Sequence, residues 1–333
     1  MKRKILISVI TTFILASLHE AWAQQQTTAN TIPRIGFISS ADTPGRRTPL
    51  FDAFRQGLSD LGYVEGKHIL IESRYAEGRL DRMPALVNEL VQQKVDVILA
   101  VNNVVIRAAK EATKTIPIVM VSSVDPVEAG YVESFARPGG NITGLTNISR
   151  DLSAKRVEVL KEVLPKMSRV AVLWDADGPG PAVAFKEYEA AARAFKIEPR
   201  SLAIRGPNPD FAGAFQTAKA ARADALVVVG NPLMSRRANQ VFELATKNHF
   251  PSMTEGGRYV DAGGLISYGA NQADLMRRAG EYVVEILKGA KPGDLPVKLP
   301  AKFEIFINLK TAQQIGLVIP QHLLVQADKV IKD

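Results

Sequence analysis

The chain has 333 residues, of which 46% are hydrophobic and 23% charged, and its formal net charge is +8 at pH 7. This composition is typical of a folded protein of about two domains and excludes a disordered, collagen-like or membrane-dominated chain. The absence of cysteine excludes disulfides, thiol nucleophiles and thiolate-bound zinc, and the four histidines stand singly. We therefore expect no metal site.

The first 23 residues have the pattern of a secretory signal peptide. Basic residues 2–4 precede an apolar run over 5–18, and the small residues of Ala21-Trp22-Ala23 fit a cleavage site. The run is shorter than the roughly 20 residues that a membrane-spanning helix needs, although an uncleaved anchor is the alternative. No cysteine follows it, so no lipid anchor is expected. We expect cleavage after Ala23 and release into the periplasm as a soluble protein that is not lipidated.

Short apolar runs alternate with amphipathic stretches from residue 34 onward. Runs of Val, Ile and Leu between helices are typical of buried parallel strands. In the first half, the expected strands are 34–40, 68–72, 95–101 and 116–121, and the expected helices are 50–61, 83–93 and 104–114.

The same alternation restarts after Asn141. A helix over 151–164 is followed by expected strands at 169–174, 197–204, 225–229, 250–254 and 264–268, with helices at 183–195, 211–223 and 235–248. The remaining segment holds one long helix over 272–288, a Pro- and Gly-rich stretch over 289–300 and a strand over 303–308. It is too short to bury a core of its own.

This pattern predicts an α/β fold with two Rossmann-like lobes. Each lobe has an open parallel sheet with helices on both faces, and several chain segments form the hinge between them. We expect residues 1–23 to be the signal peptide, 32–146 with about 270–333 to form a discontinuous first lobe, and 147–269 to form the second.

Open α/β sheets bind ligands beyond the carboxyl ends of their strands. The residues at these positions and at one crossover carry hydroxyl, amide, carboxylate and aromatic groups, and we expect ligand contacts from Ser39, Ser40, Asn102, Asn103, Ser122, Ser123, Asp125, Trp174, Asn231, Glu255 and Tyr268. No histidine stands at a strand end, and neither a Gly-x-Ser-x-Gly elbow nor a phosphate-binding glycine motif is present. We expect no catalytic residues and no cofactor.

These residues also have structural interpretations. The serine and asparagine pairs can cap helices or turns. Asp125 and Asn231 each precede a proline, which is typical of a turn or a helix start. Glu255, before two glycines, can be an exposed loop charge, and Trp174 can pack in the core instead of stacking on a ligand.

Four segments of the sequence have motifs that resemble those of a known protein family. They are 116–119 with 125–130, Arg137-Pro138-Gly139-Gly140-Asn141-Ile142-Thr143-Gly144, Gly289-Ala290-Lys291-Pro292-Gly293-Asp294-Leu295-Pro296, and 303–312 with Gly316 and Ile319-Pro320. They resemble the ABC transporter substrate-binding proteins related to tryptophan- and tyrosine-binding components, over about 33–333. The resemblance implies a type I periplasmic binding protein fold with ligand contacts from the loops at 102–103, 122–123 and 231.

One loop departs from this family. Relatives that bind amino acids tend to carry an acidic residue where this sequence has Gly230-Asn231-Pro232. An amide cannot pair with an ammonium group as a carboxylate does, which argues against an amino-acid ligand.

The resemblance implies a monomeric receptor that closes around an aromatic amino acid or a related small molecule and delivers it to ABC permease subunits. A periplasmic ligand sensor that acts through a separate signalling partner and a hydrolytic enzyme are the alternatives. The positive charge is spread along the chain without a basic cluster, so we expect no nucleic-acid partner.

Overall fold

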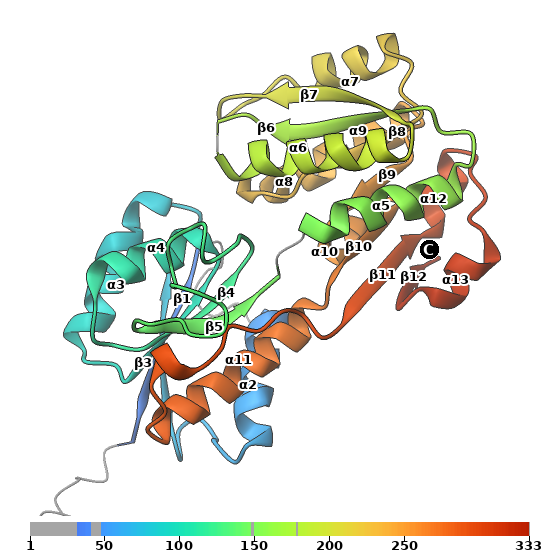
Figure 1. The fold of residues 1–333 in the computed structure, drawn as a ribbon. Coiled ribbons are helices and arrows are strands. Elements are labelled where there is room, and N and C mark those ends of the chain that lie inside the picture. The colour runs from blue at the N-terminus through green and yellow to red at the C-terminus, as the bar shows by residue number, and fades with distance from the viewer. Residues whose placement is uncertain (1–31, 41–47, 148–149, 178, 333) are drawn as a thin grey trace, which may run out of the picture.

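The computed structural model describes residues 32–40, 48–147, 150–177 and 179–332, so the expected signal peptide and its cleavage site lie outside the described residues. Two α/β lobes, each with its own sheet, are joined by several chain segments (Figure 1). Within the described ranges, no helix has both the length and the apolar character to cross a membrane.

The first lobe is built on a five-stranded parallel sheet. Its strands are β1 (Arg34–Ser39), β2 (Leu70–Tyr75), β3 (Val97–Val101), β4 (Ile118–Ser122) and β5 (Ile142–Thr146), in the order β2-β1-β3-β4-β5. Its helices are α2 (Pro49–Asp60), α3 (Met83–Gln92), α4 (Asn103–Ala112) and α11 (Gln272–Leu287), with the short turns η1 (Leu80–Arg82) and η2 (Pro292–Asp294). Apolar residues of α2 and α11 pack on one face of the sheet, and those of α3 and α4 pack on the other.

The contact between α2 and α11 depends on two glycines. A Cβ atom at Gly57 would lie 2.2 Å from the carbonyl oxygen of Arg277, and one at Gly280 would lie 3.0 Å from the backbone nitrogen of Leu58. The two helix backbones therefore approach more closely than any larger residue would allow. This close packing fixes α11 to the first lobe, although α11 follows the second lobe in the sequence.

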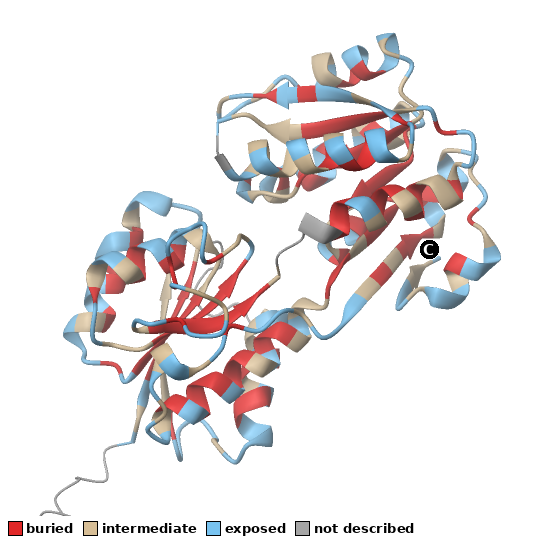
Figure 2. Cartoon of the chain, viewed as in Figure 1, coloured by how far each residue is buried: buried red, intermediate tan, exposed pale blue. Residues whose placement is uncertain are grey.

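The second lobe has a seven-stranded sheet in the order β12-β11-β10-β9-β8-β6-β7. Its strands are β6 (Arg169–Asp175), β7 (Glu198–Ile204), β8 (Ala225–Val228), β9 (Ser252–Thr254), β10 (Ile266–Ala270), β11 (Phe303–Asn308) and β12 (Lys329–Ile331). Its helices are α5 (Arg150–Val163), α6 (Pro179–Ala194), α7 (Phe211–Ala220), α8 (Pro232–Arg236), α9 (Ala238–Lys247), α10 (Gly257–Asp261), α12 (Leu309–Gln314) and α13 (Gln321–Gln326). Buried residues run along the strands of both sheets and the inner sides of the helices (Figure 2).

The segment after residue 270 divides between the lobes, and here the expected domain division is wrong. Whereas α11 packs on the first lobe, β11 pairs antiparallel with β10 and β12 pairs with β11, so both extend the second sheet. The physical reason is that β10 offers an open edge, and pairing there buries Ile305 and Ile307 in the second core. Apart from the β10–β11 pair, every pair of neighbouring strands in this sheet is parallel.

The chain passes between the lobes three times: after β5, between β10 and α11, and over 299–302. The last two are hydrogen-bonded, because the Asn271 N–H donates to the Lys302 carbonyl over 3.0 Å. Asp274 adds ion pairs of 3.8 Å to Arg278 and 3.7 Å to Lys302. The expected fold class of two α/β lobes on a multi-segment hinge is confirmed.

Replacement of Gly57 by alanine is expected to lower the free energy of unfolding by about 1–3 kcal/mol, because the added methyl group would overlap backbone atoms of α11 that cannot rotate away. Denaturant unfolding of the purified protein measures this. Gly140→Ala is the matched control, since a Cβ there meets no atom within 4 Å. Equal stability of the two variants would contradict a requirement for close helix packing.

Candidate functional site

The carboxyl ends of the parallel strands in each lobe point toward the other lobe. The chain leaves the first lobe at the end of β5 to enter α5, and it leaves the second lobe at the end of β10 to enter α11 (Figure 1). Because neighbouring strands run in the same direction, the loops after β1, β3 and β4 face those after β6, β8 and β9 across the interlobe space. This is the position at which open α/β sheets bind ligands.

Asn102 connects two of the first-lobe loops. Its side-chain oxygen accepts hydrogen bonds from the N–H groups of Val104 and Val105 and so caps α4. Its side-chain nitrogen donates to the Ser40 hydroxyl over 2.8 Å, which joins the end of β3 to the end of β1. The backbone of Asn102 has φ 73° and ψ 159°, a strained conformation that residues other than glycine rarely adopt. Asn102 is therefore the capping residue of the pair.

The neighbouring Asn103 connects the same region to β4. Its amide nitrogen donates to the Ser123 hydroxyl over 3.1 Å, and its amide oxygen accepts from the Ser122 hydroxyl over 3.1 Å. Ser122 is buried, whereas Asn103 is half-buried and Ser123 is exposed. The structure therefore groups the expected residues at 40, 102–103 and 122–123 into one polar surface at the end of the first sheet.

Asp125 and Ser39, the other two residues of the first lobe that we expected to contact a ligand, have structural roles. One carboxylate oxygen of Asp125 accepts hydrogen bonds from the N–H groups of Val127 and Glu128 over 2.8 and 3.1 Å, so it caps a turn. Ser39 is the last residue of β1 and is buried. Both lie beside the polar surface of the first lobe.

In the second lobe, Asn231 occupies the loop after β8. Its side-chain oxygen accepts from the Met234 N–H over 2.7 Å and caps α8, while its side-chain nitrogen donates to the Asp175 carboxylate over 2.9 Å. Asp175 ends β6. The hydrogen bond from Asn231 therefore places the Asp175 carboxylate beside the loop at 230–232, which contains no acidic residue of its own.

Glu255, in the loop after β9, belongs to a polar cluster whose other members are Arg156 of α5 and Tyr188 of α6. The Arg156 guanidinium is only 1% exposed. It donates hydrogen bonds to the Tyr268 carbonyl over 2.7 Å and to the Tyr188 hydroxyl over 3.0 Å. It also forms an ion pair of 3.9 Å with the Glu255 carboxylate. Burial raises the pKa of the Tyr188 phenol far above its usual range, so the hydroxyl keeps its proton. It donates to Glu255 over 3.5 Å.

The sequence interpretation missed Arg156 and Tyr188, although one signal was available for Arg156. This arginine lies in the apolar stripe of α5, four residues after Leu152 and three and four before Val159 and Leu160, all of which are buried. A charge in such a stripe must find partners, because an unpaired buried charge is costly. Which partners it finds depends on the tertiary fold, and Tyr188 has no comparable signal.

The expected aromatic residues pack within the second lobe. The Trp174 ring stacks on Phe185 with 5.0 Å between centroids, and its N–H donates to the Ser201 hydroxyl over 2.8 Å. The Tyr268 ring stacks on Phe303 with 6.0 Å between centroids. Both rings have protein partners, which agrees with the packing interpretation for Trp174.

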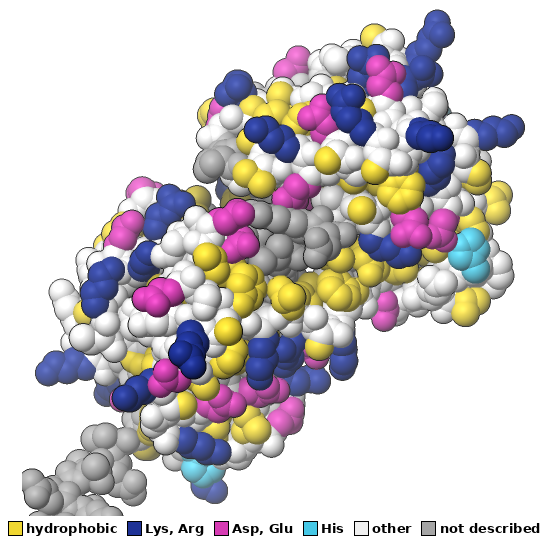
Figure 3. Space-filling model, in the orientation of Figure 1, with side chains coloured by type: hydrophobic (Ala, Val, Ile, Leu, Met, Phe, Trp, Pro, Cys, Tyr) yellow, Lys and Arg dark blue, Asp and Glu magenta, His cyan; other side chains and the backbone are white. Residues whose placement is uncertain are grey.

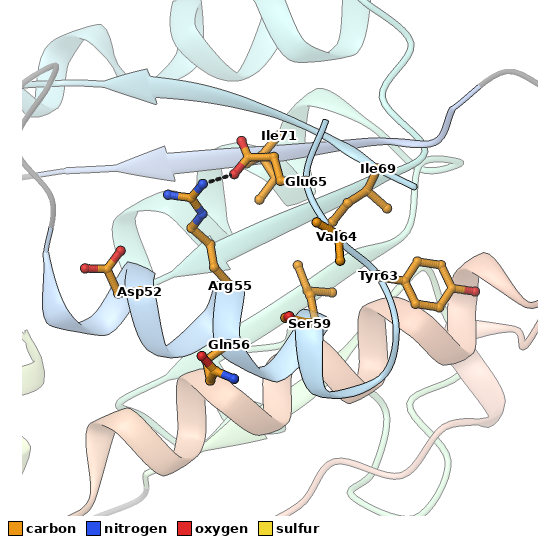
Figure 4. A pocket seen from close by; sticks show the side chains of 10 residues that line it. Asp52, Arg55, Gln56, Ser59, Tyr63, Val64, Glu65, Ile69 and Ile71 are labelled. Atoms are coloured by element: carbon orange, nitrogen blue, oxygen red, sulfur yellow. Dashed lines mark ion pairs between the residues drawn. The ribbon is translucent and has the colours of Figure 1, made fainter. Parts of the chain in front are cut away.

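Two pockets formed by described residues lie away from the loops after β1, β3, β4, β6, β8 and β9. One, of about 340 Å³, lies between α2 and β2, and the Arg55–Glu65 ion pair of 2.5 Å spans it (Figure 4). The other lies beside β7 and α7.

In the ranges that the structure covers, no group of three or more His, Asp or Glu residues could hold a metal. On the face shown in Figure 3, basic and acidic side chains are interspersed over both lobes.

Comparison with known proteins identifies the family. Residues 38–331 match the model of the ABC transporter substrate binding protein family. The chain belongs to this family. This confirms the resemblance seen in the sequence.

Similar proteins support the same assignment. A tyrosine-binding protein of Clostridioides difficile is 28% identical over 265 residues, which cover 79% of this chain and 75% of that protein. A Streptococcus pneumoniae ABC domain in complex with L-Trp is 25% identical, with a TM-score of 0.80 over 90% of this chain and all of that one. A Vibrio cholerae conserved domain protein is also 25% identical, with a TM-score of 0.79 and the same coverage. The architecture is that of the type I periplasmic binding proteins.

Replacing Asn102 by alanine is expected to lower the free energy of unfolding by about 1–2 kcal/mol, the usual range for loss of a helix N-cap. Asn102→Asp keeps the capping oxygen and loses only the donation to Ser40, so it should be less destabilising. Thermal and denaturant unfolding of both variants measure the difference. A harmless alanine variant would contradict the capping role.

Proposed function

We propose that this chain is the solute-binding component of an ABC importer and that its two lobes close around a small aromatic or polar molecule. The observation that carries the proposal is the opposition of two polar strand-end surfaces across a three-segment hinge. One surface is formed by Ser40, Asn102, Asn103 and the serines at 122–123, and the other by Asn231, Asp175 and Glu255.

An aromatic amino acid or a related solute is the ligand class that the relatives favour. One curated relative is named a tyrosine-binding protein, and one solved relative is in complex with L-Trp. The hydroxyl and amide groups of the first lobe can hydrogen-bond a carboxylate or another polar group of such a solute. Micromolar affinity requires about −8 kcal/mol, which several buried hydrogen bonds and the burial of a ring can supply.

Hinge closure explains how binding would be signalled to a transporter. A ligand held by one lobe makes further contacts when the second lobe closes, so it stabilises the closed form relative to the open one. The three crossing segments allow this rotation while each lobe keeps its own core. Permease subunits at the membrane would then receive the closed, loaded monomer.

The proposed location is the periplasm. The basic residues at 2–4, the apolar run at 5–18 and Ala21-Trp22-Ala23 support export with cleavage after Ala23, and no cysteine is available for lipid attachment.

L-tyrosine or L-tryptophan is expected to raise the melting temperature of the purified protein, because a ligand that binds only the folded state stabilises it. Small-angle X-ray scattering should show a smaller radius of gyration in the presence of the ligand that gives the shift, since closure makes the molecule more compact. D-glucose is the control solute. A broad library of solutes without any shift, together with turnover of a substrate, would favour an enzyme instead.

Expression with export in a Gram-negative host is expected to yield a protein that begins at Gln24. Intact-mass spectrometry of the periplasmic fraction measures this end. Ala23→Arg should block processing, because signal peptidase requires small residues at the cleavage site. A protein that reaches the periplasm with residues 1–23 attached would contradict cleavage.

A further inference from the structure

Arg156 connects the loop after β9, which faces the interlobe space, to the end of β10, which enters the hinge. The pairing of β9 with β10 ends at Thr254 and Ser267. Beyond these residues the connection is made by a side chain of α5: Nε of Arg156 donates to the Tyr268 carbonyl over 2.7 Å, and Nη1 lies 3.9 Å from the Glu255 carboxylate. One guanidinium therefore holds the loop and the strand together.

The backbone of the same loop also packs on β10. A Cβ atom built on Gly269 would overlap the carbonyl oxygen of Glu255 and would lie 3.8 Å from Nη2 of Arg156, so only glycine permits this approach. Two residues after Gly269, the chain crosses to the first lobe at Asn271. The loop after β9 is therefore in contact with β10 directly before a crossing of the hinge.

We propose that Arg156 is a positioning residue for lobe closure, which transmits a ligand contact at the loop after β9 to the hinge. This inference rests on the proposed function and deepens it, because it names the connection by which binding and closure are coupled.

The burial of Arg156 makes the loop and the strand move as one unit. The guanidinium is 1% exposed and has partners on three elements: the Tyr268 carbonyl of β10, the Tyr188 hydroxyl of α6 and the Glu255 carboxylate. Displacing the loop from β10 would take a partner away from a buried charge, which is costly. A ligand that moves Glu255 therefore moves the end of β10 with it.

The same arginine is connected to all three crossings of the hinge. It lies on α5, the helix that the chain enters after the crossing that follows β5 (Figure 1). Its partner Tyr268 lies three residues before the second crossing, at Asn271. The N–H of Asn271 in turn donates to the carbonyl of Lys302 in the third crossing over 3.0 Å.

The test separates closure from binding, with L-tryptophan as the probe. Calorimetry measures its affinity, thermal unfolding measures stability, and small-angle X-ray scattering measures the radius of gyration without the probe and at a saturating concentration. The variants are Arg156→Met, which removes the guanidinium, and Tyr188→Phe, which removes one of its partners. Arg193→Met is the matched control, because Arg193 forms an exposed ion pair with Glu189 in the same lobe.

L-tryptophan should decrease the radius of gyration of the unmodified protein. Arg156→Met should lower the affinity by about 10- to 100-fold, the range of a hydrogen bond to a charged group. When saturated, it should show less than about half of the normal decrease in radius, because the bound ligand then distinguishes less between the open and closed arrangements. Tyr188→Phe keeps the bond to Tyr268 and should show a smaller effect in the same direction. Arg193→Met should behave as the unmodified protein.

The radius at saturation decides the outcome, since a variant that has only lost stability would melt earlier but would still close completely once loaded. Complete closure of saturated Arg156→Met would overturn the inference and leave the proposed solute-binding function intact. If Arg156→Met does not fold, Tyr188→Phe decides: incomplete closure supports the inference, and complete closure overturns it. No decrease in the radius of the unmodified protein on saturation with L-tryptophan would overturn the inference together with the proposed closure around an aromatic solute.

Discussion

The structure depends on where the segment after residue 270 buries its apolar groups. The apolar face of α11 packs against α2 in the first lobe, through the close approach at Gly57 and Gly280, and β11 then completes hydrogen bonding along the edge of β10 in the second. Because of these two interactions, α11 and β11 lie in different lobes although they are neighbours in the sequence. The chain must therefore cross three times, and each departure from a lobe at the end of a parallel strand places the strand ends of both sheets opposite each other.

Most polar residues at the opposed strand ends serve the fold as well as the proposed site. Asn102 and Asn231 cap helices with their oxygens and use their amide nitrogens to bond a neighbouring loop. Their geometry is fixed without ligand, so little conformational freedom remains to be lost when a solute binds. Glu255 differs from them, because the groups around it orient only one of its two oxygens.

The sequence was sufficient for the fold class because short apolar runs and amphipathic stretches report local periodicity. The expected helix over 272–288 closely matches α11, and the expected strand over 95–101 contains β3. The pairing of strands was harder to predict than their positions. The sequence predicted the strand at 303–308, but its pairing with β10 depends on a strand edge that exists only in the folded sheet. The capping role of Asn102 could be predicted from its position between a strand and a helix. The Arg156–Tyr188–Glu255 cluster could not, because it joins residues that are far apart in the chain and share no local sequence pattern.

The divided C-terminal segment also constrains the order of folding during synthesis. The first lobe cannot complete its core until α11 has been made, and the second sheet lacks β11 and β12 until residue 331 has emerged. Domains commonly fold one after another as the ribosome extends the chain. Here neither half can complete its fold in this way, because each lobe needs elements that are made only near the end of the chain.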